Sequence, residues 1–441
     1  MASNLVRVLR SAPRSQQHVV SISKRELSAL LTPTEEFPGI PATSPSTSSA
    51  SKASVTTLSN GLTVVSENAS STSTVSLTFP YAGSSSESAS EGGAALVNRY
   101  LAFKSGSGLS SAIILRNLEN DGATPFASVS KSSSTVGYTA AKDKALRLVP
   151  LLATSCSFEK WDMNDAKALA GIEVEEATSN VSSVLSDSVF AAAYGAQSAY
   201  GKSLYSNSSP SSVAIQSFHQ KAYGLNGAVL AATGIDDHEV FVKAVEAGLI
   251  ESYVGKAASA AIASPFISGE TRIHAPSTGS AHVALAFQGP KGSTPLSSII
   301  QTCIDLSSNA ITGFTNPSTG LTGVYATCAP SDAVSATDAL CGSITTVPSA
   351  DIITRAIVLA KKQALLSLDS GSSQNLALKM TESVLETNSF GFSNVAAAYD
   401  DVSVDQVQAA FSAMSKSTPA VAAVGDLSYV PYQGSLVSRF S

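Results

Sequence analysis

The chain has 441 residues, of which 44% are hydrophobic and only 14% are charged, and its formal net charge is −6. A chain of this length exceeds the size at which one hydrophobic core usually stops growing, so we expect two domains of about 200 residues each. The negative charge and the lack of a basic stripe argue against a nucleic-acid-binding protein. A surface of small, weakly charged residues suits extensive protein contacts, although compositional drift would give the same figures.

The amino terminus carries basic residues and no acidic residue before Glu26. Arg7, Arg10 and Arg14 share one face of a helix until Pro13 interrupts it. A basic, acid-free amphipathic start is typical of a mitochondrial targeting segment. We expect such a segment over residues 1–35, with a flexible basic tail as the alternative.

Residues 36–51 are rich in proline and serine, which predicts a linker and not a packed element. Farther along, no run of eighteen apolar residues occurs. We therefore expect no transmembrane helix and a chain that is at most peripheral to a membrane.

A strand-to-helix pattern follows the linker. Residues 75–79 (VSLTF) alternate as a strand does, and residues 81–83 form a glycine-bearing turn. A helix is predicted after Gly92, with Ser88 and Glu91 as a capping box. Its apolar face consists of Leu96, Val97, Tyr100 and Leu101.

Further helices are predicted in both halves of the chain. Residues 143–154 indicate a helix that starts on an acidic residue and is kinked by Pro150. Residues 162–195 and 351–386 are also rich in helix-forming residues. Each of these stretches is followed by turns and then by a closing strand.

An internal duplication organises these elements. The run 75–79 recurs as 283–287 (VALAF), displaced by 208 residues, and 228–234 recurs as 421–426 with a displacement of 191 between Gly234 and Gly425. The second copy has therefore lost residues, which we expect to be missing between the 283–287 strand and Pro330.

The sequence thus predicts an α+β protein of two homologous domains, each a mixed sheet packed with helices. We place the first domain at residues 52–250 and the second at residues 268–441. Residues 251–267 are the expected linker between them, because they are of low complexity.

The histidines and cysteines do not form a recognisable metal site. The closest two of the five histidines are eight residues apart, so no pair has the spacing of an H-x-x-E-H or H-E-x-x-H site. The cysteines also lack a C-x-x-C spacing, and we expect them to be buried thiols in a reducing compartment. The histidines are His18, His219, His238, His274 and His282, and the cysteines are Cys156, Cys303, Cys328 and Cys341.

The motif LSNGLTV at 58–64, the strand at 75–79 and the helix at 91–104 together resemble the pitrilysin-type metallopeptidase superfamily, with closing strands repeated in both halves. In active members an H-x-x-E-H helix at this place binds zinc and carries the general base. The corresponding positions here are either Ala95, Asn98 and Arg99 or Leu96, Arg99 and Tyr100. Neither register supplies a zinc ligand, so we expect no metal, no cofactor and no catalytic residue.

An acidic cluster stands where the resemblance places a third zinc ligand. One of Glu173, Glu175 and Glu176 would be the counterpart of that glutamate, whereas the ordinary interpretation of such a cluster is a solvated helix face. His219 and His282 are expected to be structural residues. No G-x-S-x-G motif frames a serine nucleophile, so an independent peptidase with an unrecognised site is disfavoured.

Within the superfamily, the chain is most similar to the second core proteins of mitochondrial ubiquinol–cytochrome c reductase, respiratory complex III. The resemblance runs from about Leu58 to the carboxyl end and is closest at 422–432 (AAVGDLSYVPY). The zinc-free alpha subunits of the mitochondrial processing peptidase are the alternative. Those subunits carry a glycine-rich loop, whereas residues 307–323 here contain three scattered glycines and a proline.

This resemblance implies a non-catalytic structural core subunit on the matrix side of the mitochondrial inner membrane. Its implied partners are a homologous first core protein or beta-type processing-peptidase subunit, together with cytochrome b, cytochrome c1, the Rieske protein and small subunits. The redox centres of such a complex lie in those other chains. The alternative implies an alpha subunit that captures presequences for a zinc-bearing partner.

Overall fold

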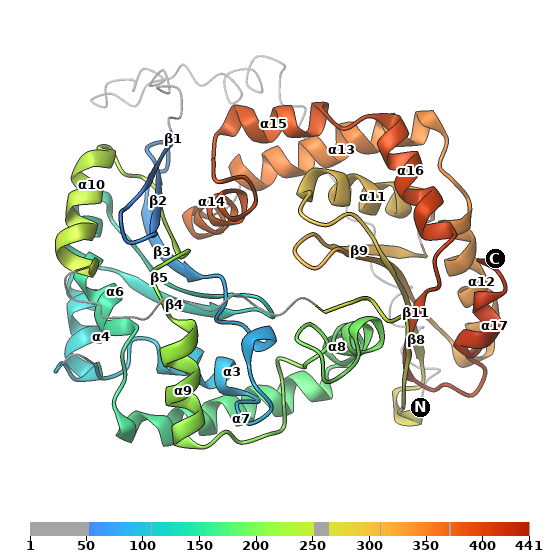
Figure 1. Ribbon diagram of the computed structural model, residues 1–441, viewed down its shortest axis with the longest axis horizontal. Helices are drawn as coiled ribbons and strands as arrows, with labels where there is room; N and C mark the ends of the chain where they lie inside the picture. The colour runs from blue at the N-terminus through green and yellow to red at the C-terminus, as the bar shows by residue number, and fades with distance from the viewer. Residues whose placement is uncertain (1–52, 107, 251–263, 309, 370–371, 441) are drawn as a thin grey trace, which may run out of the picture. The chain divides into compact units, whose positions relative to one another are not determined.

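The computed structural model describes residues 53–106, 108–250, 264–308, 310–369 and 372–440 (Figure 1). These residues belong to one compact unit, residues 50–441. The expected targeting segment (1–35) and the linker after it (36–51) lie outside the described residues, as do residues 251–263 of the expected inter-domain linker.

The first half of the described chain builds a six-stranded mixed sheet in the order β1-β2-β6-β3-β5-β4. β2 and β6 are parallel, and the other neighbouring pairs are antiparallel. The strands are β1 (Ala53–Thr57), β2 (Thr63–Glu67), β3 (Ser73–Phe79), β4 (Thr124–Val129), β5 (Ser134–Ala140) and β6 (Val229–Ala232).

The second half builds a five-stranded mixed sheet in the order β7-β11-β8-β10-β9. β7 and β11 are parallel, and the other neighbouring pairs are antiparallel. The strands are β7 (Glu270–His274), β8 (Ala281–Gln288), β9 (Thr312–Asn316), β10 (Leu321–Cys328) and β11 (Ala420–Gly425).

The two sheets confirm the predicted duplication. The order β2-β6-β3-β5-β4 matches β7-β11-β8-β10-β9 strand for strand and direction for direction, and only β1 has no counterpart. Val75 in β3 and Val283 in β8 occupy equivalent central strands, as predicted. The shortening also lies where it was expected, because residues 80–133 separate β3 from β5 whereas only residues 289–320 separate β8 from β10.

The helices of the first half other than α7 and α8 pack on the sheet around one large apolar cluster, which β3 and β5 line with Val75, Leu77, Phe79 and Tyr138. The helices are α3 (Ala94–Leu101), α4 (Ser111–Asn120), α5 (Lys142–Ala145), α6 (Val149–Ser155), α7 (Met163–Ser179), α8 (Val181–Tyr194), α9 (Ser212–Ala222) and α10 (His238–Val245).

The predicted helix over 143–154 is wrong in detail. The segment divides into α5, a 3-10 turn at Leu146–Leu148 and α6, and Pro150 lies in the first turn of α6. Proline is favourable there because the first turn of a helix needs no partner for its N–H groups. Pro150 therefore starts a helix where the sequence indicated a kink.

The helices of the second half other than α14 form an equivalent cluster with β8 and β11. The predicted helical stretches 162–195 and 351–386 are confirmed as the pairs α7–α8 and α13–α14. The helices are α11 (Thr294–Ser307), α12 (Ala333–Thr345), α13 (Ala350–Asp369), α14 (Ser373–Thr387), α15 (Phe392–Asp400), α16 (Val404–Ser415) and α17 (Gln433–Val437).

One helix of each half packs on the sheet of the other half. α8 packs on β7, β8 and β11 of the second sheet, and α14 packs on β2, β3 and β6 of the first (Figure 1). Leu185 and Val189 of α8 meet Ala284 and Ala286, which are the small residues on the face of β8 opposite its large ones. Small residues on that face let a helix approach the sheet closely.

Polar contacts also connect α8 and α14 to the half of the chain on which each of them packs. The hydroxyl of Ser373, at the start of α14, lies 2.8 Å from the hydroxyl of Thr74 in β3 and accepts from that of Thr72 at 3.0 Å. The hydroxyl of Tyr194, at the end of α8, donates to the carbonyl of Thr319 in the second half at 3.0 Å. The buried polar groups at both junctions therefore have partners.

Within the described part of the chain, no single helix is long and apolar enough to span a membrane. Residues 330–345 and 350–369 satisfy the length and hydropathy criteria only as a pair, and the two helices are bent by 93° at their junction.

The packing of α14 on the first sheet gives the first testable prediction. Met380 of α14 is fully buried in a cluster with Val65 and Ala231 of the first sheet, although it belongs to the second half. Met380→Ala should lower the free energy of unfolding by about 2–5 kcal/mol because it leaves a cavity. Hydrogen exchange should also accelerate at β2 and β6, far away in the sequence.

The matched control is Val213→Ala, because Val213 is 75% exposed. That substitution should change the free energy of unfolding by less than about 0.5 kcal/mol. Accelerated hydrogen exchange restricted to α13, α14 and the second sheet would contradict the packing of α14 on the first sheet.

Candidate functional site

The helix at which the resemblance implied a metal site, α3, is held in place by a buried carboxylate that the sequence did not single out. Gly93 precedes the helix with φ of +83°, a conformation that favours glycine. The Glu87 carboxylate accepts hydrogen bonds from the N–H groups of Gly93 (3.1 Å) and Ala95 (2.8 Å). It thereby satisfies two of the N–H groups that a helix start leaves free.

The predicted capping box is wrong as a cap for this helix, because α3 begins at Ala94 and not next to Gly92. Half of its bonding pattern is present, since the Ser88 N–H donates to the Glu91 carboxylate at 2.8 Å. Glu91 is also paired with Lys221 of α9 at 2.9 Å. The pair Ser88 and Glu91 therefore fixes the turn before the helix, and Glu87 caps the helix itself.

The predicted apolar face of α3 is confirmed. Leu96, Val97 and Leu101 are buried in one cluster with residues of α7, and Tyr100 packs against it. The α7 residues in this cluster are Met163, Ala166, Ala170 and Val174. This packing aligns α3 beside α7, which carries the acidic cluster.

Glu173 of α7 is the one member of that cluster that meets α3. Arg99 forms a bidentate ion pair with Glu173, with Nη2–Oε2 at 2.7 Å and Nη1–Oε1 at 2.9 Å. The Tyr100 hydroxyl donates to Oε2 of Glu173 at 2.8 Å, and the Arg99 guanidinium lies 4.4 Å from the centre of the Tyr100 ring. Glu175 and Glu176 are exposed, as expected of a solvated helix face.

The packing of α3 distinguishes the two registers of the H-x-x-E-H motif that the sequence left open. Ala95 is buried in the core of the first sheet, away from α7. Leu96 and Tyr100, four residues apart, both face α7, where Glu173 lies. Of the two registers that the resemblance implies, Leu96, Arg99 and Tyr100 is therefore the one that lies on the side of α7.

This arrangement holds α3 to α7 through an ion pair and a hydrogen bond. The guanidinium neutralises Glu173 and offers five N–H donors, yet arginine stays protonated in proteins and accepts no proton. Leucine provides no ligand atom, and the Tyr100 hydroxyl is already bonded to Glu173. The residues present thus do not fit a zinc ion at this place.

The histidines of the described chain are held by structural contacts. His219 is half-buried on α9 between the rings of Tyr223 (4.5 Å, stacked) and Phe158 (4.9 Å, edge-on). Burial lowers the pKa of His219 to about 4, so the ring is neutral at physiological pH. The nitrogens of His282 lie within hydrogen-bond distance of the hydroxyls of Ser280 and Thr327. His18 lies outside the described residues.

The acidic and sulfur-bearing side chains do not assemble a metal site in the described ranges, where no group of three His, Cys, Asp or Glu residues could hold an ion. Cys303 and Cys341 are buried free thiols, as expected, whereas the free thiol of Cys328 is only half-buried. Burial raises the pKa of Cys303 to about 12 and that of Cys341 to about 11. Such thiols are unreactive at neutral pH because the thiolate is the nucleophile.

Residues 307–323 contain most of a β-hairpin. β9 and β10 pair antiparallel from Thr312 opposite Tyr325 to Asn316 opposite Leu321. At Gly323 an added Cβ would lie 2.3 Å from the carbonyl oxygen of Leu285, so glycine is required there by a close approach of two strands. Gly313 lies in β9, and Gly320 lies in the turn before β10 with φ of +74°, so all three glycines belong to the hairpin.

Comparisons with known proteins agree with this geometry. Residues 63–207 match the family described as insulinase (peptidase family M16). The chain is 30% identical over 249 residues to a mitochondrial-processing peptidase subunit alpha from Solanum tuberosum, covering 55% of this chain and 48% of the relative. It is 29% identical over 267 residues to a probable alpha-2 subunit from Arabidopsis thaliana, covering 58% and 52%. The chain thus spans about half the length of the curated relatives it matches.

A solved structure, complex III2 from Candida albicans with Inz-5 bound, contains a chain with the same fold. The TM-score is 0.73 at 18% sequence identity, over 88% of this chain and 99% of that chain. The predicted pitrilysin-like α+β fold is therefore confirmed, as is the resemblance to the superfamily of core proteins and processing-peptidase subunits.

The Arg99–Glu173 pair gives the second testable prediction. Both side chains are 22% exposed and make a two-pronged contact, so a double-mutant cycle with Arg99→Met and Glu173→Leu should give a coupling free energy of about 1–2 kcal/mol. The same cycle at the exposed pair Lys379–Glu382 should give less than about 0.5 kcal/mol. Equal coupling in both cycles would show that Arg99 does not hold α3 to α7.

The buried cap gives a third prediction. Burial raises the pKa of Glu87 to about 7, against the N–H groups of Ala95 and Gly93, which lower it. Folding therefore takes up a proton at this carboxyl between the ordinary pKa of about 4.5 and about pH 7. Its contribution to stability is greatest at acidic pH and declines as the pH rises through 7.

Glu87→Gln stays neutral at every pH, so the variant should gain stability relative to the wild type between pH 5 and pH 8, by about 2–3 kcal/mol. Chemical denaturation at several pH values measures this difference. Glu119→Gln, at an exposed position on α4, is the control for the loss of a surface carboxylate. A flat difference for Glu87→Gln would mean that Glu87 is ionised throughout.

Proposed function

We propose that this chain, which has the fold of the M16 peptidases, is a non-catalytic structural core subunit of mitochondrial respiratory complex III. Its role would be in the assembly and stability of ubiquinol–cytochrome c reductase, whose redox centres lie in other chains. The observation that carries the proposal is the replacement of a metal site by Leu96, Tyr100 and the Arg99–Glu173 ion pair. The similarity in fold to a chain in the complex III structure supports it.

A structural role explains the other features of the chain. The exchange of α8 and α14 between the two halves favours one rigid body over a hinged pair of domains. The surface is poor in charged residues, since only 14% of the chain is charged, and such surfaces suit large persistent interfaces. An obligate partner interface would bury roughly 2,000 Å² or more.

The proposal includes location and partners. The chain would lie on the matrix side of the mitochondrial inner membrane, peripheral to the bilayer, after import directed by residues 1–35. It would bind a homologous first core protein or beta-type processing-peptidase subunit, and it would contact cytochrome b, cytochrome c1, the Rieske protein and small subunits. Residues 52–250 and 268–441 would be its two domains, joined by residues 251–267, and residues 36–51 would link the targeting segment to the first domain.

A second function is favoured by the sequence relatives, which are alpha subunits of the mitochondrial processing peptidase. In that role the chain would capture presequences for a zinc-bearing partner. A receptor for varied extended peptides needs a mobile segment that closes over them. Residues 312–316 and 321–328 are paired strands instead, which favours the structural role.

A fourth prediction separates the two functions. Depleting this chain in its native cells should reduce the amount of assembled complex III, because a structural core subunit is required for the other chains to stay together. Native gel electrophoresis with a ubiquinol–cytochrome c reductase assay measures this loss. Processing of newly imported precursors should continue at its normal rate.

The isolated chain, titrated with a fluorescent presequence peptide, should bind it weakly or not at all. The control is a processing-peptidase alpha subunit from a relative, tested under the same conditions. The alternative function would replace our proposal if depletion stopped presequence removal while complex III remained assembled and active.

A further inference from the structure

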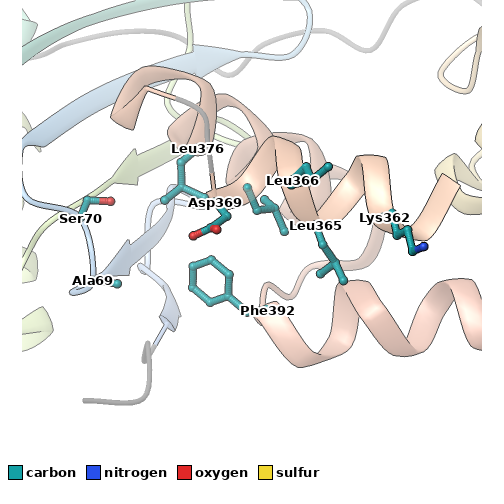
Figure 2. Close-up of a pocket in the computed structure, with 9 residues that line it drawn as sticks. Ala69, Ser70, Lys362, Leu365, Leu366, Asp369, Leu376 and Phe392 are labelled. Carbon is teal, nitrogen blue, oxygen red and sulfur yellow. The ribbon is translucent and has the colours of Figure 1, made fainter. Parts of the chain in front are cut away.

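A groove at the carboxyl end of α13 is not accounted for by the proposed function. It has a volume of about 780 Å³ and is partly open to solvent, and side chains of α13 line it (Figure 2). Lys362 lies at one end of it and Ser70 at the other, with Leu376, Phe392 and the Asp369 carboxylate between them. The groove therefore joins the second half of the chain to the loop that follows β2.

The walls of the groove are fixed by buried contacts. Glu67 is 1% exposed, and its carboxylate accepts hydrogen bonds from the N–H groups of Ala69, Ser70 and Gly234, which holds the loop at one end. Across the groove, the Phe392 ring packs edge-on against that of Phe390 at 5.2 Å. A groove with such walls is largely preformed, as binding grooves usually are.

The outer face of α13 is apolar along this groove. Leu365 is 37% exposed and Leu366 is 60% exposed, and Val358, two turns earlier on the same face, is 47% exposed. Two consecutive exposed leucines beside a concave surface, with Val358 two turns away on the side of Leu365, are typical of a site where another protein docks.

Two opposite charges bracket these leucines. Lys362 and Asp369 are seven residues apart on α13, which places them about 10 Å apart along the helix axis. Both side chains are exposed, and neither forms an ion pair with any residue that the structure describes. The groove thus presents a positive end, an apolar centre and a negative charge at the far side of that centre.

We propose that this groove binds an amphipathic helix of a partner protein, one that carries an acidic and a basic residue about two turns apart with leucine-like residues between them. The acidic residue of the partner pairs with Lys362, the basic residue pairs with Asp369, and the apolar residues cover Leu365 and Leu366. The helical form follows from the spacing, because residues seven apart on a helix lie on one face at the separation of the two charges.

The charge pattern favours this occupant over others. A purely basic helix, such as a targeting peptide, would place a like charge against Lys362. An anionic lipid that used Lys362 for its headgroup would extend its chain past the Asp369 carboxylate, which is unfavourable to bury. The inference rests on the groove itself and holds whether the chain serves complex III or another assembly.

Alanine-based helical peptides of about 15 residues are the probes. All three have the same two central leucines, and the charged positions seven residues apart carry glutamate and lysine, two glutamates or two lysines. Fluorescence anisotropy with the full chain should show the tightest binding for the glutamate–lysine peptide. Each matched pair should improve affinity by about twofold to fivefold, as exposed ion pairs do.

Charge reversal then tests the assignment of each partner. Asp369→Lys should shift the preference to the peptide with two glutamates, and Lys362→Glu should shift it to the peptide with two lysines. Leu365→Ser combined with Leu366→Ser should weaken every peptide by at least about tenfold. Arg355→Glu, on the same helix but outside the groove lining, is the matched control and should leave the order of preference unchanged.

Several results would overturn the proposal. Absence of binding by all three peptides would do so, as would equal affinity for the three or a preference that Asp369→Lys does not move. Self-association of the chain that Leu366→Glu abolishes would assign the groove to a second copy. Binding to anionic phospholipid vesicles that Leu365→Glu abolishes, without peptide binding, would assign it to a lipid. None of these outcomes bears on complex III assembly, so failure here is distinguishable from failure of the proposed function.

Discussion

The architecture depends on the need to cover both faces of each central sheet. Every residue of β3 is buried, and so is every residue of β11. Because neighbouring residues in a strand point to opposite faces, full burial requires a layer on each side. The helices of one half cover only one face, and the helix received from the other half covers the second. The two halves therefore stabilise each other in a way that two independently folded domains would not.

The cost of burying an unpaired charge also explains the contacts of Glu173, in the region where the resemblance implied a zinc site. A carboxylate that a metal ion would otherwise neutralise needs another positive partner once the histidines are absent, since an unpaired, partly buried charge is costly. Arg99 supplies that charge to Glu173, and Tyr100 adds a hydrogen bond. Leu96 fills the remaining space with apolar packing against α7. An ion pair, a hydrogen bond and apolar packing thus join α3 to α7 at this place.

The sequence predicted the parts of this structure that depend on local patterns. The alternation of Val75, Leu77 and Phe79 indicated a strand, and the repeat at Val283 indicated its equivalent, because burial of one face imposes a period of two. The start of α3 was missed because its cap, Glu87, lies outside the usual capping positions and reaches the helix through a turn. Pro150 was misread because one residue type both starts helices and interrupts them.

The sequence by itself determined the duplication, the fold class, the position of the shortening and the absence of histidine pairs at helical spacing, since each is a property of order and spacing along the chain. The tertiary structure decided which register of α3 faces α7, which glutamate of the acidic cluster is paired, and that the second face of β3 is covered. Thr74 shows the reason: its polar side chain indicates a solvent-facing position, but Ser373 of α14, 299 residues away, contacts it. Contacts between such distant residues are set by how whole elements pack, and no local pattern encodes them.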